Sequence, residues 1–245
     1  MNRKNLRSLA AGVALLLAVG ALAGCGGEKK ADDSKKMVTV GIAQLVEHGA
    51  LDAANKGFVA GMASKGFKEN ENVKYDRQNA QADQSNLQNI AQRFVSNKVD
   101  LICAIATPTA QTMANATKDI PIVATAVTDY EVAKLAASNN EPKGNVTGTS
   151  DMNPIDQQLE LLLKIAPQTK NIGTVYSSSE VNSQLQAELL KKYAAEKGVQ
   201  VEEATVSNVN DIQQAAQSLV GKVDAVYVPT DNVLASAMPK LAQVT

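Results

Sequence analysis

Short apolar runs alternate along the chain with segments whose apolar residues recur at helical spacing. The first run is VTVGIA at 38–43, which predicts a strand, and apolar residues three or four positions apart follow from Leu51 to Met62. This spacing predicts an amphipathic helix, and Gly66 supplies its stop. The same order of strand and helix then repeats.

The next strand-like run is VKYDRQ at 73–78, and the apolar face of a second helix follows at 87–95. Two further runs, LICAIA at 101–106 and IVATAV at 122–127, are apolar on both faces, which predicts fully buried strands. Buried strands separated by helices imply a parallel sheet covered on both sides, because a parallel connection requires a crossover. We therefore expect an open α/β layer.

The pattern restarts after the polar segment SNNEPKGN at 138–145 and the short strand VTGTS. The segment LQNIAQRFVSNKVDLICAIATPT, which begins at Leu87, aligns with IQQAAQSLVGKVDAVYVPTDN, which begins at Ile212, with a one-residue gap. Likewise VGIAQLVEH at 40–48 parallels IGTVYSSSEV at 172–181. An internal duplication of this kind predicts two lobes of like topology, each an open parallel sheet, with a ligand cleft between them. We place these lobes at residues 37–150 and 151–245.

The N-terminus predicts a lipoprotein signal. Basic residues precede an apolar run from Leu9 to Leu22, which is shorter than the roughly 20 residues that a membrane-spanning helix needs. The run leads into Leu-Ala-Gly-Cys, which resembles the bacterial lipobox, so we expect Cys25 to be acylated. The alternative is an incidental cysteine after an ordinary signal peptide. We assign 1–24 to the signal peptide and the charged, glycine-led segment 25–36 to a lipidated flexible tether.

Composition narrows the function classes. The 245 residues carry 24 Lys and Arg against 25 Asp and Glu, which argues against a nucleic-acid surface. With Cys25 acylated, only Cys103 remains, so we expect a buried thiol and no disulfide. One histidine, His48, and one buried thiol fall short of the usual metal-ligand set and of a catalytic cysteine with its base. We expect no metal, no cofactor and no enzymatic activity.

Polar residues gather where the buried strands end. Ligands of open α/β sheets bind at the carboxyl ends of the strands, so these residues are candidates for binding a ligand. The alternative is that Ser, Thr, Asp and Asn before a helix are ordinary N-caps. The candidates are Gln44, Glu47, His48, Thr107, Thr109, Thr128, Asp129, Ser177, Ser178, Ser179, Asn182, Thr230, Asp231 and Asn232.

Taken together, the motifs resemble a known family. Duplicated α/β lobes behind a lipobox, with KVDLICAIATPTAQ, PIVATAVTD, NVTGTSDMNP and YSSSEVNS, look like the substrate-binding lipoproteins of ABC importers. More narrowly, they resemble the type I periplasmic-binding-protein family that includes tryptophan and tyrosine binders.

The resemblance implies a monomeric two-lobed clamp, lipid-anchored to the membrane at the bacterial cell surface or in the periplasm. The clamp would capture a small molecule, above all an aromatic amino acid, and deliver it to an ABC permease. Helix N-termini after Thr107 and Ser179 would hold the ligand carboxylate, and Asp129, Asp151 or Asp231 would pair with its ammonium. A slot for the ligand side chain would come from Leu45, Pro108, Tyr130, Met152 and Tyr176.

Other function classes stay open on the residues alone. A surface sensor would bind the same ligand and signal instead of transporting it. A cell-envelope hydrolase would need His48 to meet the serines at 177–179 across a cleft. A LacI-like regulator shares the fold, but a lipobox stands where its DNA-binding segment would be.

Two further expectations concern the chain end and Gln44. Type I binding proteins return from the second lobe to the first, so we expect a sequence that stops at Thr245 to be C-terminally incomplete, with unpaired sheet edges. From its position at a strand end, we expect Gln44→Ala to weaken ligand binding more than His48→Ala, with little loss of fold from either.

Overall fold

The computed structural model describes residues 37–142 and 144–244 of the chain. The predicted signal peptide, the acylated Cys25 and the tether at 25–36 lie outside the described residues and stay predictions. Across the described ranges, none of the helices combines the length and the apolar character needed to cross a membrane.

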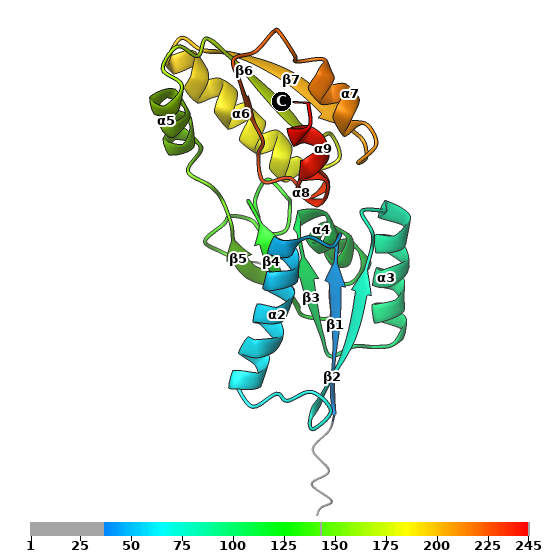
Figure 1. Cartoon of the computed structure of the whole chain (residues 1–245). Helices are drawn as coiled ribbons and strands as arrows, with labels where there is room; N and C mark the ends of the chain where they lie inside the picture. Colours follow the sequence, from blue (N-terminus) through cyan, green and yellow to red (C-terminus); the bar gives the residue numbers. More distant parts are fainter. Residues whose placement is uncertain (1–36, 143, 245) are drawn as a thin grey trace, which may run out of the picture. The chain divides into compact units, whose positions relative to one another are not determined.

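Five parallel strands form the first sheet, in the order β2-β1-β3-β4-β5 (Figure 1). They are β1 (Val38–Gln44), β2 (Val73–Asn79), β3 (Leu101–Ile105), β4 (Ile122–Val127) and β5 (Val146–Ser150). At its end, β1 places Gln44 opposite Asn79 of β2 and opposite Ile105 of β3. Because all five strands run in the same direction, their carboxyl ends share one edge of the sheet.

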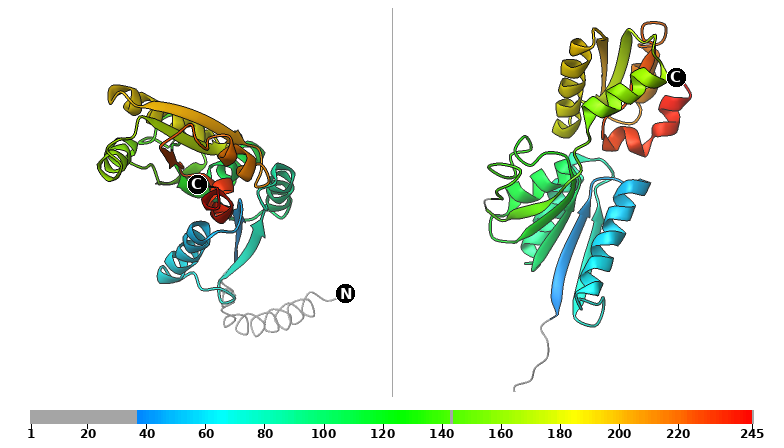
Figure 2. Two further views of the ribbon diagram at one scale, coloured as in Figure 1. Left: turned by 45° about the horizontal axis from the view of Figure 1, so that its top comes forward. Right: turned by 90° about the vertical axis from the view of Figure 1, so that its left-hand side faces the viewer.

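Helices cover both faces of the first sheet (Figure 2). They are α2 (Gly49–Ser64), α3 (Gln84–Ser96) and α4 (Thr107–Ala116). The chain passes from β1 outward to β2 and then back across to β3 and β4. Right-handed crossovers therefore place α2 on one face and α3 and α4 together on the other. The buried core lies between the sheet and the helices on each of its faces. Its largest fully buried side chains include Phe94, Leu87, Ile42 and Met113.

The second sheet repeats this topology with three parallel strands in the order β7-β6-β8. Its elements are α5 (Ile155–Ile165), β6 (Asn171–Ser177), α6 (Val181–Glu196), β7 (Gln200–Val206), α7 (Ile212–Gln217), β8 (Ala225–Tyr227), α8 (Asn232–Ser236) and α9 (Met238–Ala242). Separate apolar clusters lie around Leu190, beneath α5 and α6, and around Leu219, beneath α7. The order of β6, β7 and β8 matches that of β1, β2 and β3.

The duplication extends to close packing contacts. Gly41 on β1 lies against the ring of Phe94, where an added Cβ would come within 2.7 Å of the ring. Gly173 on β6 lies in the same way against Leu219, where an added Cβ would come within 2.8 Å of a methyl group. The sequence repeats align Gly41 with Gly173 and Phe94 with Leu219. In both sheets, then, glycine is needed at this position of β1 and β6 because equivalent residues of the repeat, Phe94 and Leu219, pack against it.

The helix stops predicted by glycine are also repeated. Gly66 follows α2 with φ of 90°, and Gly198 follows α6 with φ of 72°. These left-handed conformations suit glycine, which lacks the Cβ that makes them costly for other residues. The pairs Lys65-Gly66 and Lys197-Gly198, which occupy the same place in the sequence repeat, therefore mark equivalent helix ends in the two halves.

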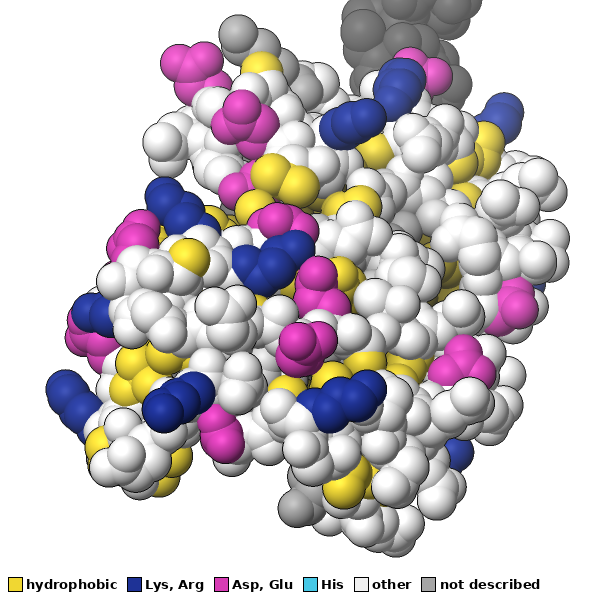
Figure 3. Space-filling model, turned by 90° about the horizontal axis from the view of Figure 1, so that it is seen from above, with side chains coloured by type: hydrophobic (Ala, Val, Ile, Leu, Met, Phe, Trp, Pro, Cys, Tyr) yellow, Lys and Arg dark blue, Asp and Glu magenta, His cyan; other side chains and the backbone are white. Residues whose placement is uncertain are grey.

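Charge is mixed on the surface seen from above in Figure 3, where Lys and Arg side chains lie interspersed with Asp and Glu. Positive and negative side chains are thus mixed on this face, as they are nearly equal in number in the sequence. Inside the protein, Cys103 lies on β3 and is fully buried, as predicted. Burial raises the pKa of its thiol to about 12.

The α/β fold with two similar parallel sheets is therefore confirmed. The exact lobe boundary near residue 150 stays a prediction.

Candidate ligand-binding site

Gln44 ends β1 with its side chain buried and fully engaged by the start of α2. Its Nε2 donates to Val46 O at 2.9 Å and to Asp52 Oδ1 at 2.7 Å. Its Oε1 accepts from Asn55 Nδ2 at 3.0 Å. The bonds to Asp52 and Asn55 tie the strand end to α2, and the bond to Val46 holds the loop between them. The side chain is 4% exposed, so we no longer expect Gln44→Ala to leave the fold intact.

The neighbouring candidates, Glu47 and His48, lie on the loop between β1 and α2. Glu47 is exposed and His48 is half-buried. A pocket of about 440 Å³ opens beside this loop, at the carboxyl ends of β1 and β2. Its lining mixes carboxylates and cations and includes Glu47, Asp52, Lys56 and Arg77. A pocket of about 570 Å³ lies between α3 and α4, away from the strand ends.

The N-terminus of α4 carries two buried candidates, Thr107 and Thr109. The residue before them, Ala106, has φ of 88° and provides no side-chain cap for the helix. Thr109 is 0% exposed, and its Oγ1 has no hydrogen-bond partner among the described residues. A buried hydroxyl in this state is unusual, because burying a polar group without a partner is costly. The helix end thus offers free donors.

Asp151 and Thr128 lie together where β4 and β5 end. Ser150 Oγ donates to Thr128 O at 2.7 Å, and Asp151 N donates to Val127 O at 3.1 Å. The Oδ1 of Asp151 is buried without a hydrogen-bond partner among the described residues. Burial raises the pKa of Asp151, although a hydrogen bond from the Thr128 side chain opposes the shift. This carboxylate is therefore only partly satisfied.

Asp129, one residue after Thr128, has a different environment. Its Oδ1 accepts from Val132 N at 2.8 Å and its Oδ2 accepts from Asn139 Nδ2 at 2.9 Å. Both oxygens thus hold the loop that follows β4. Of the two carboxylates near this strand end, Asp151 is the one left with unused acceptor capacity.

In the second sheet, Asp231 sits at the N-cap of α8 and is 3% exposed. Its Oδ2 accepts from Ser177 N at 2.6 Å and from Ser183 Oγ at 2.7 Å. Its Oδ1 accepts from Leu234 N at 2.8 Å. Burial raises the pKa of Asp231, and these hydrogen bonds lower it in part. Asp231 therefore joins the ends of β6 and β8 to two helices.

Glu180 lies beside Asp231 and was not among the sequence-based candidates. It is 1% exposed. It accepts from the backbone N–H groups of Asn232 at 3.1 Å and Val233 at 3.2 Å, and from the side-chain amides of Asn182 at 3.1 Å and Asn232 at 2.6 Å. Burial, followed by the charge of Asp231, raises the pKa of Glu180 to about 7. The duplication alone hinted at this residue, because it aligns Glu180 with His48.

The remaining candidates of the second sheet divide into buried and exposed residues. Asn182 is 4% exposed and its Nδ2 donates to Thr230 O at 2.9 Å, but its Oδ1 has no partner among the described residues. Thr230 N donates to Gln186 Oε1 at 3.1 Å. Ser178 and Ser179 are exposed, and the Oγ of Ser179 lies 2.9 Å from that of Ser177.

Two side-chain contacts connect residues that follow β1 and β5 of the first sheet with residues that follow β8. His48 Nε2 lies 3.4 Å from Asn232 Oδ1. Asn153 Nδ2 donates to Thr230 Oγ1 at 2.5 Å. The structure thus brings together His48, Thr230, Asp231, Asn232 and Asn182, whereas Gln44 and Asp129 are engaged locally.

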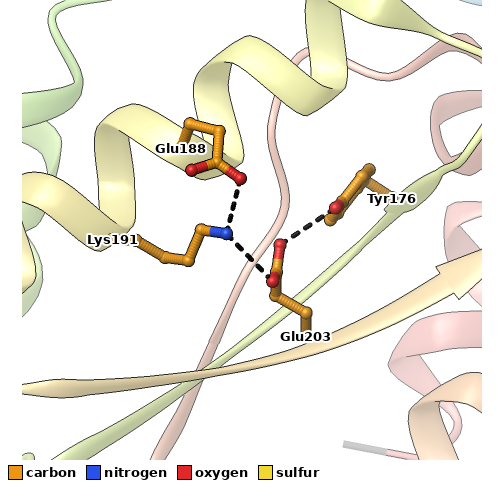
Figure 4. Close-up of polar contacts among 4 residues, drawn as sticks. All are labelled: Tyr176, Glu188, Lys191 and Glu203. Carbon is orange, nitrogen blue, oxygen red and sulfur yellow. Dashed lines mark hydrogen bonds and ion pairs between the residues drawn. The ribbon is translucent and has the colours of Figure 1, made fainter.

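Tyr176, proposed above for a side-chain slot, belongs to a polar network on the second sheet (Figure 4). Its hydroxyl donates to Glu203 Oε1 at 2.9 Å, and Lys191 bridges Glu203 and Glu188 at 3.1 and 2.5 Å. Burial, followed by the hydrogen bond to Glu203, raises the pKa of Tyr176 to about 12. Tyr130 is similarly engaged, because its hydroxyl donates to Ala124 O at 3.0 Å. Both tyrosine hydroxyls thus have partners within the protein.

This chain is similar to several known proteins. A family described as ABC transporter substrate binding protein matches residues 39–245. The tyrosine-binding protein of Clostridioides difficile is 48% identical, over 99% of this chain and 72% of its own length.

Two solved structures are also similar to this chain. The ABC domain from Streptococcus pneumonia, in complex with L-Trp, is 42% identical with a TM-score of 0.82, and covers 85% of this chain and 70% of its own. A conserved domain protein from Vibrio cholerae is also 42% identical with a TM-score of 0.83, and covers 85% of this chain and 71% of its own.

Proposed function

The chain belongs to the ABC transporter substrate-binding protein family and has the type I periplasmic-binding-protein fold, and we propose that its ligand is an aromatic amino acid held between the strand ends of its two sheets. Its function, the capture of a small molecule outside the cytoplasm for an ABC transporter, follows from the family. The amino-acid ligand rests on the site.

The observation that carries the proposal is the pair of unsatisfied buried atoms at the carboxyl edge of the first sheet. Thr109 Oγ1 and Asp151 Oδ1 are both buried without a hydrogen-bond partner among the described residues. Folded proteins rarely leave buried polar groups unpaired unless a ligand, water or ion completes them. Both residues are among the candidates that the sequence indicated.

The two residues offer complementary chemistry. The free N–H groups at the start of α4, with Thr107 and Thr109, suit a carboxylate. Asp151 suits an ammonium group, because an opposite charge would repay the cost of burying its carboxylate. They follow β3 and β5, which lie two strand spacings apart, about 10 Å. Their side chains can therefore meet around the two charged groups of one amino acid.

The relatives support an aromatic side chain. One is a tyrosine-binding protein and another was solved with L-Trp, and each is more than 40% identical to this chain. In our proposal the ring lies toward the second sheet, beside Thr230 and Asn232. Asn182 Oδ1, which is buried and unpaired, supplies a polar acceptor there.

The rest of the proposal concerns the cellular setting. We propose that Cys25 carries the lipid that anchors the protein to the bacterial membrane, that the segment 25–36 acts as a tether, and that the monomer delivers its ligand to an ABC permease. Residues 37–150 and 151–245 would act as the two lobes of a clamp. The protein would bind its ligand without converting it.

A thermal-shift series with the full chain tests the ligand class. Saturation at a hundredfold excess over Kd stabilises the folded state by about 2.7 kcal/mol, which corresponds to a rise in Tm of about 5 to 10 °C for a protein of this size. We expect such a rise with L-tyrosine or L-tryptophan and little rise with L-lysine. The absence of a rise with every aromatic amino acid would contradict the proposed ligand.

The variant Asp151→Asn separates a binding role from a structural one. Because Asp151 Oδ1 is buried and unpaired, neutralising it should preserve or raise the Tm of the ligand-free protein while reducing the shift with ligand to about half or less. The matched control is Asp224→Asn. Asp224 accepts from Lys170 N and Asn171 N at the opposite edge of the second sheet, so its loss should lower Tm and leave the ligand shift intact.

A further inference from the structure

Asn232 is the meeting point of the two halves of the chain. Its Nδ2 donates to Glu180 Oε2 at 2.6 Å, and its Oδ1 lies 3.4 Å from His48 Nε2. Its backbone N–H also donates to Glu180 Oε1 at 3.1 Å. The residue is 6% exposed, so its amide has few alternative partners in solvent.

The two partners of Asn232 occupy equivalent places in the duplicated sequence. His48 is the N-cap of α2 and Glu180 is the N-cap of α6. Neither side chain caps its own helix. Instead, both are directed to the same carboxamide. The two equivalent positions therefore hold different residues, so an acidic side chain lies on one side of Asn232 and an imidazole on the other.

The carboxylate of Glu180 determines which way the Asn232 amide points. An ionised carboxylate only accepts hydrogen bonds. If the amide were reversed, its Oδ1 would face Glu180 Oε2 at about the same short separation, with no hydrogen between two acceptors, which is unfavourable. With the observed orientation, an acceptor faces His48. The ring must then carry its proton on Nε2 for the contact to be a hydrogen bond.

We propose that Glu180 is a positioning residue that fixes the Asn232 amide, and thereby selects the Nε2–H tautomer of His48 and the direction of the hydrogen bond between the two halves. The inference rests on the proposed function in one respect. If a ligand is held between the strand ends of the two sheets, this bond helps to hold them around it. Weakening the bond then weakens ligand affinity.

Nitrogen NMR of the imidazole ring tests the positioning directly, because His48 is the single histidine of the sequence. We would label histidine with ¹⁵N in the full chain and record spectra at alkaline pH, where Glu180 is ionised and imidazole is neutral. The expected signal shows a protonated Nε2 and an unprotonated Nδ1. A predominant Nδ1–H tautomer in the unmodified protein would overturn the proposal.

The variant Glu180→Gln tests cause and effect. Its amide can donate to Asn232 Oδ1, so the carboxamide of Asn232 turns and presents Nδ2 to His48. We expect the tautomer to shift toward Nδ1–H. The matched control is Glu203→Gln, the same change in the network of Figure 4, where Glu203 bonds Tyr176 and Lys191. The control should leave the tautomer unchanged, and an unchanged tautomer in Glu180→Gln would refute the positioning role.

A second variant covers the case in which Glu180→Gln does not fold. Asn232→Ala removes the acceptor of His48 and keeps the Glu180 carboxylate, so the tautomer ratio should move toward that of a histidine side chain free in water. A ratio equal to that of the unmodified protein would overturn the proposal.

Affinity for L-tyrosine, measured on these proteins and on His48→Ala, separates this inference from the proposed function. His48→Ala, which removes the bond to Asn232, should weaken binding about fivefold, as expected for one modest hydrogen bond, and Glu203→Gln should not. Unaltered affinity in His48→Ala would overturn the link to ligand binding. If the unmodified protein binds no aromatic amino acid but shows the expected tautomers, the proposed ligand fails and the positioning role stands.

Discussion

Gln44→Ala should destabilise the protein because this side chain joins the end of β1 to α2. The substitution removes two hydrogen bonds between neutral groups, each worth about 1 kcal/mol, and one to the Asp52 carboxylate, worth about 2 kcal/mol. Water entering the vacated space restores part of this loss. We expect the free energy of unfolding to fall by about 2 to 3 kcal/mol.

Urea denaturation of the full chain, followed by circular dichroism, measures this loss. The midpoint should fall while the slope with denaturant stays constant, since the surface exposed on unfolding is unchanged. Two variants serve as controls. His48→Ala removes a single contact of 3.4 Å from a half-buried residue, and Gln92→Ala changes an exposed glutamine on α3. Each should cost less than about 1 kcal/mol.

The result that would refute this reasoning is a Gln44→Ala protein as stable as Gln92→Ala. In that case the hydrogen bonds around Gln44 would not hold α2 in place. A loss of ligand affinity without a loss of stability would instead return Gln44 to the role of a direct ligand contact.

Three other predictions follow from buried groups. Gly41→Ala and Gly173→Ala should each lower the free energy of unfolding by about 1 to 3 kcal/mol, because the added Cβ would overlap Phe94 or Leu219. Thermal denaturation measures this loss, and an unchanged Tm would contradict the packing. Cys103, whose pKa burial raises to about 12, should resist alkylation at neutral pH until urea unfolds the protein, as peptide mass spectrometry can show; rapid labelling of the native protein would contradict its burial. The pKa of Glu180 is higher in the folded protein than in the unfolded chain, so protonation of Glu180 stabilises the folded state. This contribution to the free energy of unfolding should be complete below pH 4.5 and disappear as pH rises to about 7. Glu180→Gln should flatten this part of the pH profile of stability, and an unchanged slope would count against the raised pKa.

The strands of this fold could be predicted because their burial is encoded locally. LICAIA predicted a strand at 101–106 and the structure has β3 at Leu101–Ile105, while IVATAV coincides with β4. A run that is apolar on both faces has few stable places outside a covered parallel sheet. The duplication predicted two lobes of like topology, and the strand order β7-β6-β8 repeats the order β2-β1-β3.

The individual roles of the polar residues were harder to predict, because they depend on contacts between distant segments. Glu180 follows three serines and resembles a surface residue in sequence, yet it is buried by α8, whose N-terminus lies 52 positions away. Asp129 and Asp151 both follow strands of the first sheet. Only the structure shows that the loop of Asn139 satisfies Asp129 and leaves Asp151 partly unpaired.

Calorimetric titration of L-tyrosine into the full chain and into its Asp151→Asn variant tests the central claim most directly. We predict saturable binding at one site per chain, tight in the unmodified protein and at least tenfold weaker in the variant, because the ammonium group loses its charged partner. N-acetyl-L-tyrosine, which lacks the ammonium, should bind both proteins equally weakly. Equal affinity of both proteins for L-tyrosine would contradict the proposed site, and no binding of L-tyrosine or L-tryptophan would contradict the proposed ligand.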